Sequence, residues 1–181
     1  MTAPVDVDFD LGEAIAAAAA AASPLWEEYL LPADERFPDP VFSTLARPDH
    51  RLGLETIYEG YLVHYGRPRL FSPPDDDGSL LLGDYLYAHG LVRVAELGDV
   101  AAVGDLAELI SLCAQARADD RDGDGAAWAA TAALLGHGAL GDARDTLRVD
   151  GDPGPLERAA RDAAGDRAVE AAVAAHARLV G

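Results

Sequence analysis

The chain has 181 residues, half of them hydrophobic and a quarter charged, which suits one globular domain with a sizeable core. Its 32 acidic residues outnumber its 14 basic ones and give a formal net charge of −18. This charge excludes the broad basic surfaces that bind nucleic acids or anionic membranes, and it is compatible with cationic or basic partners.

Residues 1–9 are expected to form a disordered tail, and residues 10–181 a single domain. The alanine run at 14–22 has the apolar character of a signal-peptide core. The segment before it, VDVDFD, is acidic where a signal needs basic residues, and the run is too short to span a bilayer. We therefore expect a cytoplasmic protein without membrane insertion. Cys113 is the only cysteine, so no internal disulfide is possible, and we interpret it as an inert core thiol.

Capping residues, prolines and glycines divide the chain into helical segments. Asp10 with Glu13 makes a capping-box-like start for the first helix, and Ser23 followed by Pro24 starts the second. The predicted helices, in chain order, are about 10–22, a short one from 24, 48–65, 80–97 capped by Ser79 or Asp77, 100–117, 126–135, 139–147 and 155–180. No segment alternates polar and apolar residues as a strand does. The sequence therefore predicts an all-α bundle of seven or eight helices.

Two of these helices carry acidic residues whose placement can be predicted from the helical period. In the segment GDYLYAHGLVRVAELGD, residues 83–99, the polar side is formed by His89, Arg93 and Glu96, and Asp84 falls on the opposite, apolar side. A buried carboxylate without a partner is costly, so we expect Asp84 to be buried against an arginine, a helix N-terminus or a cation. On the next helix, Val103, Leu106, Ile110 and Cys113 are expected to line the apolar face, and Asp105, Glu108 and Gln115 the opposite, polar face.

A family resemblance rests on two motifs at a matching separation. GRP at 66–68, followed after a spacer by LLLGDYLYAHGLVRVAELGD at 80–99, resembles the middle of trans-type polyprenyl diphosphate synthases. Members of this all-α family carry an Asp-rich DDxxD motif, a basic RRGxP segment and a helix that begins GDxLxxxA, whose alanine is Ala88 here. The resemblance covers about residues 50–117. It implies a shortened isoprenoid-synthase bundle, in a family that joins isopentenyl diphosphate to an allylic diphosphate with Mg²⁺.

The resemblance also implies where ligand-binding residues stand. The first Asp-rich motif falls on ETIYE, in which Glu55 and Glu59 hold the outer acidic positions and Thr56 replaces an aspartate. Their i, i+4 spacing places both carboxylates on one helix face, as bridging by Mg²⁺ requires. The basic pair that follows in the family has become His64 and Tyr65, and the chain contains no lysine.

Three further candidate ligand residues come from the same resemblance. Arg67 stands near the diphosphate position, and Asp84 begins the GD helix. Asp145 is the one aspartate retained where residues 143–153, ARDTLRVDGDP, echo the second Asp-rich motif.

A separate acidic pattern suggests a cation site. Asp120, Asp122 and Asp124, followed by Gly125, match the start of an EF-hand loop, although Thr131 replaces the acid expected at position twelve. The segment is either a weak Ca²⁺ or Mg²⁺ site or a solvated acidic turn.

These observations favour a non-catalytic homologue of polyprenyl diphosphate synthase that acts as a partner or regulatory subunit. The resemblance implies association with an active synthase chain or a homodimer, because some family members pair a catalytic with a non-catalytic chain and family dimers bury helices from this part of the fold. In that interpretation Leu86, Leu91 and Val94 are packing residues. Two alternatives stay open. One is a reduced Mg²⁺-dependent prenyltransferase, and the other is a stand-alone binder of an isoprenoid or other apolar ligand.

Overall fold

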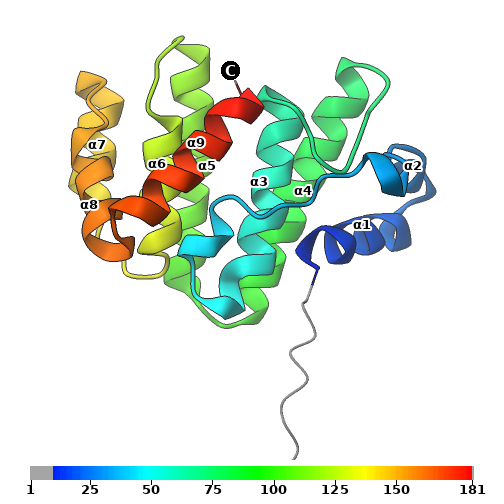
Figure 1. The fold of residues 1–181 in the computed structure, drawn as a ribbon, viewed down its shortest axis with the longest axis horizontal. Coiled ribbons are helices and arrows are strands. Elements are labelled where there is room, and N and C mark those ends of the chain that lie inside the picture. The colour runs from blue at the N-terminus through cyan, green and yellow to red at the C-terminus, as the bar shows by residue number, and fades with distance from the viewer. Residues whose placement is uncertain (1–9, 181) are drawn as a thin grey trace, which may run out of the picture.

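Helices account for nearly all regular structure in residues 10–180, the part of the chain that the computed structural model describes (Figure 1). The predicted all-α class is confirmed, and the only strand-like pairing in this part is an isolated bridge between Leu30 and Phe71. The predicted tail at 1–9 lies outside the described residues. The α-helices are α1 Leu11–Ala22, α2 Pro24–Glu28, α3 Arg51–Tyr65, α4 Asp76–Glu96, α5 Val100–Ala118, α6 Asp124–Ala133, α7 Gly141–Asp150, α8 Gly154–Ala164 and α9 Asp166–Val180. Three short 3₁₀ helices precede α3: η1 Ala33–Glu35, η2 Ser43–Leu45 and η3 Pro48–His50.

The predicted helix starts near the N-terminus are confirmed by their caps. Asp10 accepts a hydrogen bond from the Glu13 N–H at 3.1 Å, and Ser23 accepts one from the Leu25 N–H at 3.2 Å. Two other predicted boundaries are wrong. Helix α4 starts at Asp76, four residues before the predicted start. Asp75 caps it by accepting a hydrogen bond from the Gly78 N–H. The predicted helix 155–180 is divided into α8 and α9 by Gly165, whose φ of +85° interrupts the helical backbone.

Glycines allow α3 and α4 to pack with their backbones in contact. Gly53 and Gly60 on α3 face Gly90 and Gly83 on α4. A Cβ added at Gly90 would lie 2.8 Å from the Gly53 carbonyl oxygen, and one added at Gly60 would lie 3.0 Å from the Gly83 carbonyl oxygen. Gly83, the first residue of the GD pair, is thus a packing residue in this structure.

The prediction that Asp84 is buried is wrong. Its side chain is 67% exposed, and its nearest titratable partner is His64, whose Nε2 lies 3.3 Å from Asp84 Oδ1. The buried side of α4 instead carries Leu82, Gly83, Leu86, Gly90 and Val94. The helical-period argument failed because both sides of α4 carry large apolar residues: Leu82, Leu86 and Val94 are buried, whereas Leu81 and Val92 are exposed. The glycines that mark the contact face give no hydrophobic signal.

On the predicted polar face of α5, Asp105 is buried rather than exposed. Its side chain is 5% exposed, accepts a bond from Arg144 Nη1 at 2.9 Å and accepts another from the Gly136 N–H. Helix α7 packs against α5 and brings Arg144 to Asp105, whereas Glu108 and Gln115 on the same side of α5 stay exposed.

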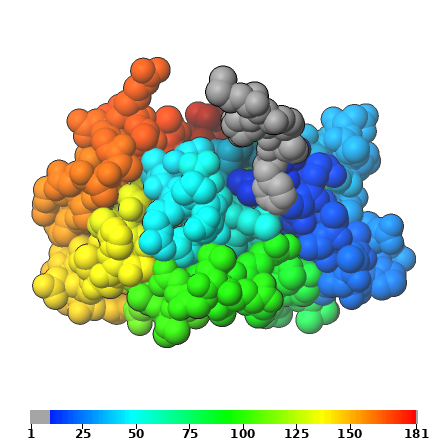
Figure 2. All heavy atoms as spheres, turned by 90° about the horizontal axis from the view of Figure 1, so that it is seen from below, coloured from blue at the N-terminus to red at the C-terminus, as the bar shows by residue number. Residues whose placement is uncertain are grey.

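The core has a larger and a smaller part. The larger part contains an aromatic group of Phe42, Tyr58, Tyr61 and Trp128, and the smaller packs α1 against α3 and α4. Figure 2 shows the chain near residue 50 in the middle of one face, between the N-terminal helices in blue and the C-terminal helices in yellow and orange. Within residues 10–180, no helix has both the length and the apolar character needed to cross a membrane.

Candidate functional site

The two predicted acidic positions on α3 lie in the core, where they share one arginine. Arg69 Nη1 donates to Glu55 Oε1 at 2.7 Å, and Arg69 Nε donates to Glu59 Oε2 at 2.9 Å. None of the three side chains is more than 2% exposed. The i, i+4 spacing does place both carboxylates on one face of α3, and in this structure that face holds a guanidinium.

Backbone N–H groups complete the hydrogen bonding of both carboxylates. Glu55 accepts bonds from the N–H groups of Val41 and Ser43, and Glu59 accepts bonds from those of residues 69 and 70. Each glutamate thus anchors an irregular segment of chain against α3. Buried carboxylates are tolerated only with such partners, so the arrangement accounts for their presence in the core.

The charges in this cluster hold the guanidinium protonated. Burial alone would lower the pKa of Arg69, but the neighbouring charges of Glu55 and Glu59 outweigh burial and raise it. The Tyr58 ring adds a cation–π contact, with its centre 5.2 Å from the guanidinium carbon. A divalent cation between the two carboxylates would have to displace Arg69, which has no other carboxylate partner among residues 10–180.

The other candidate ligand residues lie on the surface, away from the buried acidic pair. Arg67 is exposed and places its guanidinium 4.7 Å from the centre of the Phe37 ring. Asp84 is exposed on α4, and Asp145 is exposed on α7, where it pairs with Arg148 three residues later. The structure therefore brings together only the two glutamates of the predicted set.

The acidic turn between α5 and α6 does not gather its three aspartates. Asp120 and Asp122 are exposed, whereas Asp124 begins α6 and turns its carboxylate into the protein. Across residues 10–180, no group of three or more Asp, Glu, His or Cys side chains is arranged to hold a metal ion.

Asp124 instead joins a polar network that spans four helices. Its Oδ2 accepts hydrogen bonds from the Tyr61 hydroxyl and from Arg117, and it lies 3.4 Å from His176 Nε2. His176 Nδ1 is in turn 2.9 Å from the Tyr58 hydroxyl oxygen. The members come from α3, α5, α6 and α9, so no local spacing in the sequence could have indicated the network.

Electrostatics keeps the centre of this network ionised. Burial alone would raise the pKa of the Asp124 carboxyl, but the neighbouring His176 imidazole, a hydrogen bond from Tyr61 and the charge of Arg117 outweigh burial and lower the pKa below its usual range. Burial, reinforced by Asp124, raises the pKa of the Tyr61 hydroxyl, which therefore stays protonated and donates. The network therefore contains an ionised Asp124 carboxylate that accepts hydrogen bonds from the Tyr61 hydroxyl and from Arg117.

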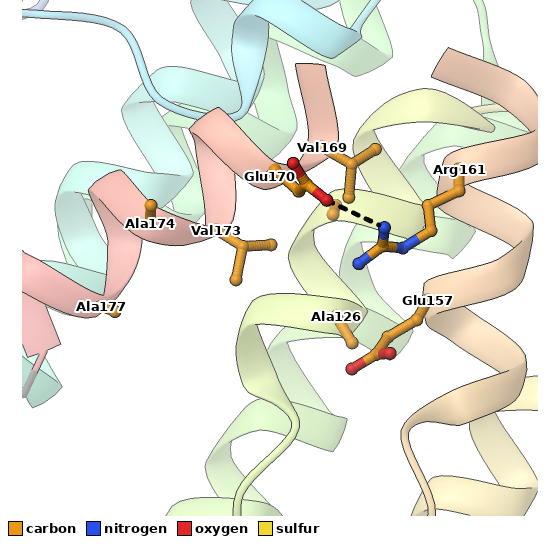
Figure 3. A pocket seen from close by; sticks show the side chains of 9 residues that line it. Ala126, Glu157, Arg161, Val169, Glu170, Val173, Ala174 and Ala177 are labelled. Carbon is orange, nitrogen blue, oxygen red and sulfur yellow. Dashed lines mark hydrogen bonds and ion pairs between the residues drawn. The ribbon is translucent and has the colours of Figure 1, made fainter. Parts of the chain in front are cut away.

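A hollow of about 390 Å³ opens between α6, α8 and α9 (Figure 3). Small apolar side chains form its floor, and the ion pair between Arg161 of α8 and Glu170 of α9, 3.3 Å apart, crosses it. Its lining residues are Ala126, Ala129, Glu157, Arg161, Val169, Glu170, Val173, Ala174 and Ala177. Its volume falls within the range of small-molecule sites.

A second hollow of about 380 Å³ adjoins the first, in front of the Asp124 and His176 network. The two share four lining residues, Ala126, Glu157, Val173 and Ala177, and therefore adjoin each other; together they are called the cleft below. One end of this cleft is apolar, and the other is lined by charged side chains and by the start of α6.

The outward face of α4 carries an exposed apolar stripe. Leu81 and Val92 are more than half exposed. Ala88, which lies between them on the helix, and Ala95, which follows Val92, are exposed as well. Asp84 is the acidic residue within this stripe. Contiguous apolar residues on an exposed helix face are typical of protein contact surfaces.

Comparisons with protein-family models, curated proteins and solved structures found no match to this chain.

Proposed function

We propose that this protein is a non-catalytic partner subunit of a polyprenyl diphosphate synthase. In this proposal it associates with an active synthase chain and does not itself turn over isoprenoid diphosphates. The supporting observation is the burial of Glu55 and Glu59 against Arg69. At the positions that correspond to metal-binding acids in the resemblance, the charge is already balanced by a guanidinium and by backbone N–H groups.

The chemistry of prenyl transfer explains why this observation matters. Ionising an allylic diphosphate requires divalent cations and cationic side chains that neutralise the leaving pyrophosphate. Where the resemblance expects a basic pair, His64 packs against Gly83 and lies beside Asp84. Burial lowers the pKa of His64 below its ordinary value, which favours a neutral imidazole at pH 7. A neutral imidazole would neutralise a diphosphate poorly.

The exposed stripe on α4 is the surface that we assign to the synthase partner. It lies on the helix that carries the GD motif, and the resemblance implies that helices of this region are buried in family dimers. Leu86 and Val94 are buried within the chain itself. The residues available to a partner are therefore their outward neighbours Leu81, Ala88 and Val92.

Co-purification with a prenyl diphosphate synthase from the same source tests the proposal. We expect the two chains to elute together and the synthase's rate or product length to change when this chain is added. Val92→Glu should abolish the association without unfolding the protein, because Val92 is exposed. Val149→Glu is the matched control, since Val149 is an exposed valine on α7, and it should leave the association intact.

Two outcomes would overturn the proposal. One is a synthase whose elution and activity are indifferent to this chain. The other is an association that Val92→Glu and Val149→Glu weaken equally, which would remove the α4 stripe from the contact.

A further inference from the structure

The cleft between α6, α8 and α9 has an apolar floor made by small side chains. Ala126 and Ala129 line it from α6, and Val173, Ala174 and Ala177 line it from α9. Larger residues at these positions would fill the space between the helices. The floor therefore offers an aliphatic group a surface that is partly shielded from water.

The charged groups around the cleft are unequally paired. Arg161 pairs with Glu170 and Asp166, Arg117 pairs with Asp124, and Arg121 lies 4.0 Å from Asp119. Every arginine that lines the cleft thus already has a carboxylate within reach.

Two carboxylates of the cleft lining, Glu157 and Asp122, have no ion-pair partner within residues 10–180. Glu157 borders both hollows, and in Figure 3 it extends from α8 toward Ala126 on the apolar floor. The uncompensated charge beside the apolar floor is therefore negative, as is the chain as a whole at −18.

We propose that this cleft binds a small aliphatic amine. Its alkyl chain would lie over the floor between Ala129 and Val173, and its ammonium would pair with Glu157. An alkylammonium, like a lysine side chain, stays protonated at pH 7 and finds its counter-ion in an unpaired carboxylate. A carboxylate ligand would find no unpaired cation in the cleft. The side chain of Asp124 lies at the start of α6 and already pairs with Arg117.

Isothermal titration of the purified full chain with octylammonium, octanol and octanoate at pH 7 tests this proposal. The three probes share one alkyl chain and differ in head-group charge. We expect saturable one-to-one binding of octylammonium, weaker binding of octanol and the weakest binding of octanoate. Raising the salt concentration should weaken the octylammonium complex and leave the octanol complex unchanged.

Paired variants locate the site. Glu157→Gln should weaken octylammonium binding roughly two- to fivefold and leave octanol binding unchanged, because one exposed ion pair is lost. Ala177→Leu should weaken both probes by at least about fivefold, since the larger side chain fills the floor. Asp162→Asn on α8 and Ala171→Leu on α9 are exposed matched controls outside the lining, and both should bind like the parent protein.

Three results would overturn the proposal. The first is octanoate binding as tightly as octylammonium, and the second is the absence of saturable octylammonium binding. The third is equal weakening by Glu157→Gln and Asp162→Asn, which would indicate attraction to the overall negative charge. Each result leaves the partner-subunit proposal untouched, because that proposal concerns α4.

Discussion

Arg69 Nη1 lies 2.7 Å from Glu55 Oε1, and neither side chain is more than 2% exposed. Removing one member of so deeply buried an ion pair leaves the other as an uncompensated charge in the core. Glu55, which the family resemblance would assign to metal binding, in this structure pairs with Arg69 and accepts hydrogen bonds from the backbone N–H groups of Val41 and Ser43.

The first prediction concerns the arginine of this cluster. Arg69→Met keeps much of the side-chain volume but leaves Glu55 and Glu59 without a cation. We expect the free energy of unfolding to fall by about 3–5 kcal/mol, as measured by urea denaturation followed by circular dichroism. Arg67→Met is the control, because Arg67 is exposed two residues away, and it should change stability by less than about 1 kcal/mol. Equal effects of the two substitutions would contradict the structural role of Arg69.

The second prediction concerns the contact between α3 and α4. Gly90→Ala adds a Cβ that would lie 2.4 Å from Ile57 Cγ1 and 2.8 Å from the Gly53 carbonyl oxygen. Alanine favours a helix over glycine by about 1 kcal/mol, but the overpacking costs about 1–3 kcal/mol, so we expect a net loss of stability.

Gly104→Ala on α5 is the matched control for this contact. An added Cβ at Gly104 meets nothing within 4 Å, so we expect stabilisation by up to about 1 kcal/mol. Thermal unfolding of both variants measures the difference. A stabilising Gly90→Ala would show that the two helices can separate without cost.

The third prediction concerns the pH dependence of stability at Asp124. The folded protein lowers the pKa of this carboxyl, so below about pH 4 the unfolded chain binds a proton that the folded chain does not. The stability contributed by the ionised carboxylate is therefore fully present above that pH and is lost as the pH falls toward the folded pKa. Asp124→Asn should cost about 1–3 kcal/mol at pH 7, and the deficit should shrink between about pH 4 and pH 2.

Urea denaturation of the parent protein and the Asp124→Asn variant at a series of pH values measures this difference. Asp122→Asn serves as the control, because Asp122 is exposed in the same turn and should behave like the parent at every pH. A deficit for Asp124→Asn that stays constant from pH 7 to pH 2 would mean that ionisation of this carboxyl does not contribute to stability.

The fourth prediction concerns Asp84. Its exposed pair with His64 should contribute little, so Asp84→Asn should change the free energy of unfolding by less than about 1 kcal/mol. A loss above about 2 kcal/mol in thermal or urea unfolding would indicate a buried role.

Local signals predicted the helices well, and long-range partners limited what could be predicted of the site. The caps at Asp10 and Ser23 depend on neighbouring residues, and both are confirmed. The spacing of Glu55 and Glu59 correctly indicated one helix face, but it carried no information about the arginine that reaches that face from the following loop. The network of Asp124 and His176 joins helices far apart in the sequence, so only the folded chain reveals it.

The burial of Asp84 and Asp105 was mispredicted for related reasons. Helical periodicity identifies a contact face by its large apolar residues, but α4 carries such residues on both sides, and glycines such as Gly83 make its closest contacts with α3. Helix α7 packs against α5, so Asp105 is buried with Arg144 of α7 as its partner. In both cases the packing of a neighbouring helix, which the local sequence does not specify, determined whether the aspartate side chain is buried.

The most direct test of the non-catalytic proposal is incubation of the purified protein with labelled isopentenyl and allylic diphosphates and Mg²⁺. We predict that no prenyl product forms, because the two carboxylates of α3 are engaged by Arg69 and the N–H groups around them. Formation of a prenyl product that disappears in a folded Glu55→Gln variant would contradict this prediction and would identify the buried pair as a metal site.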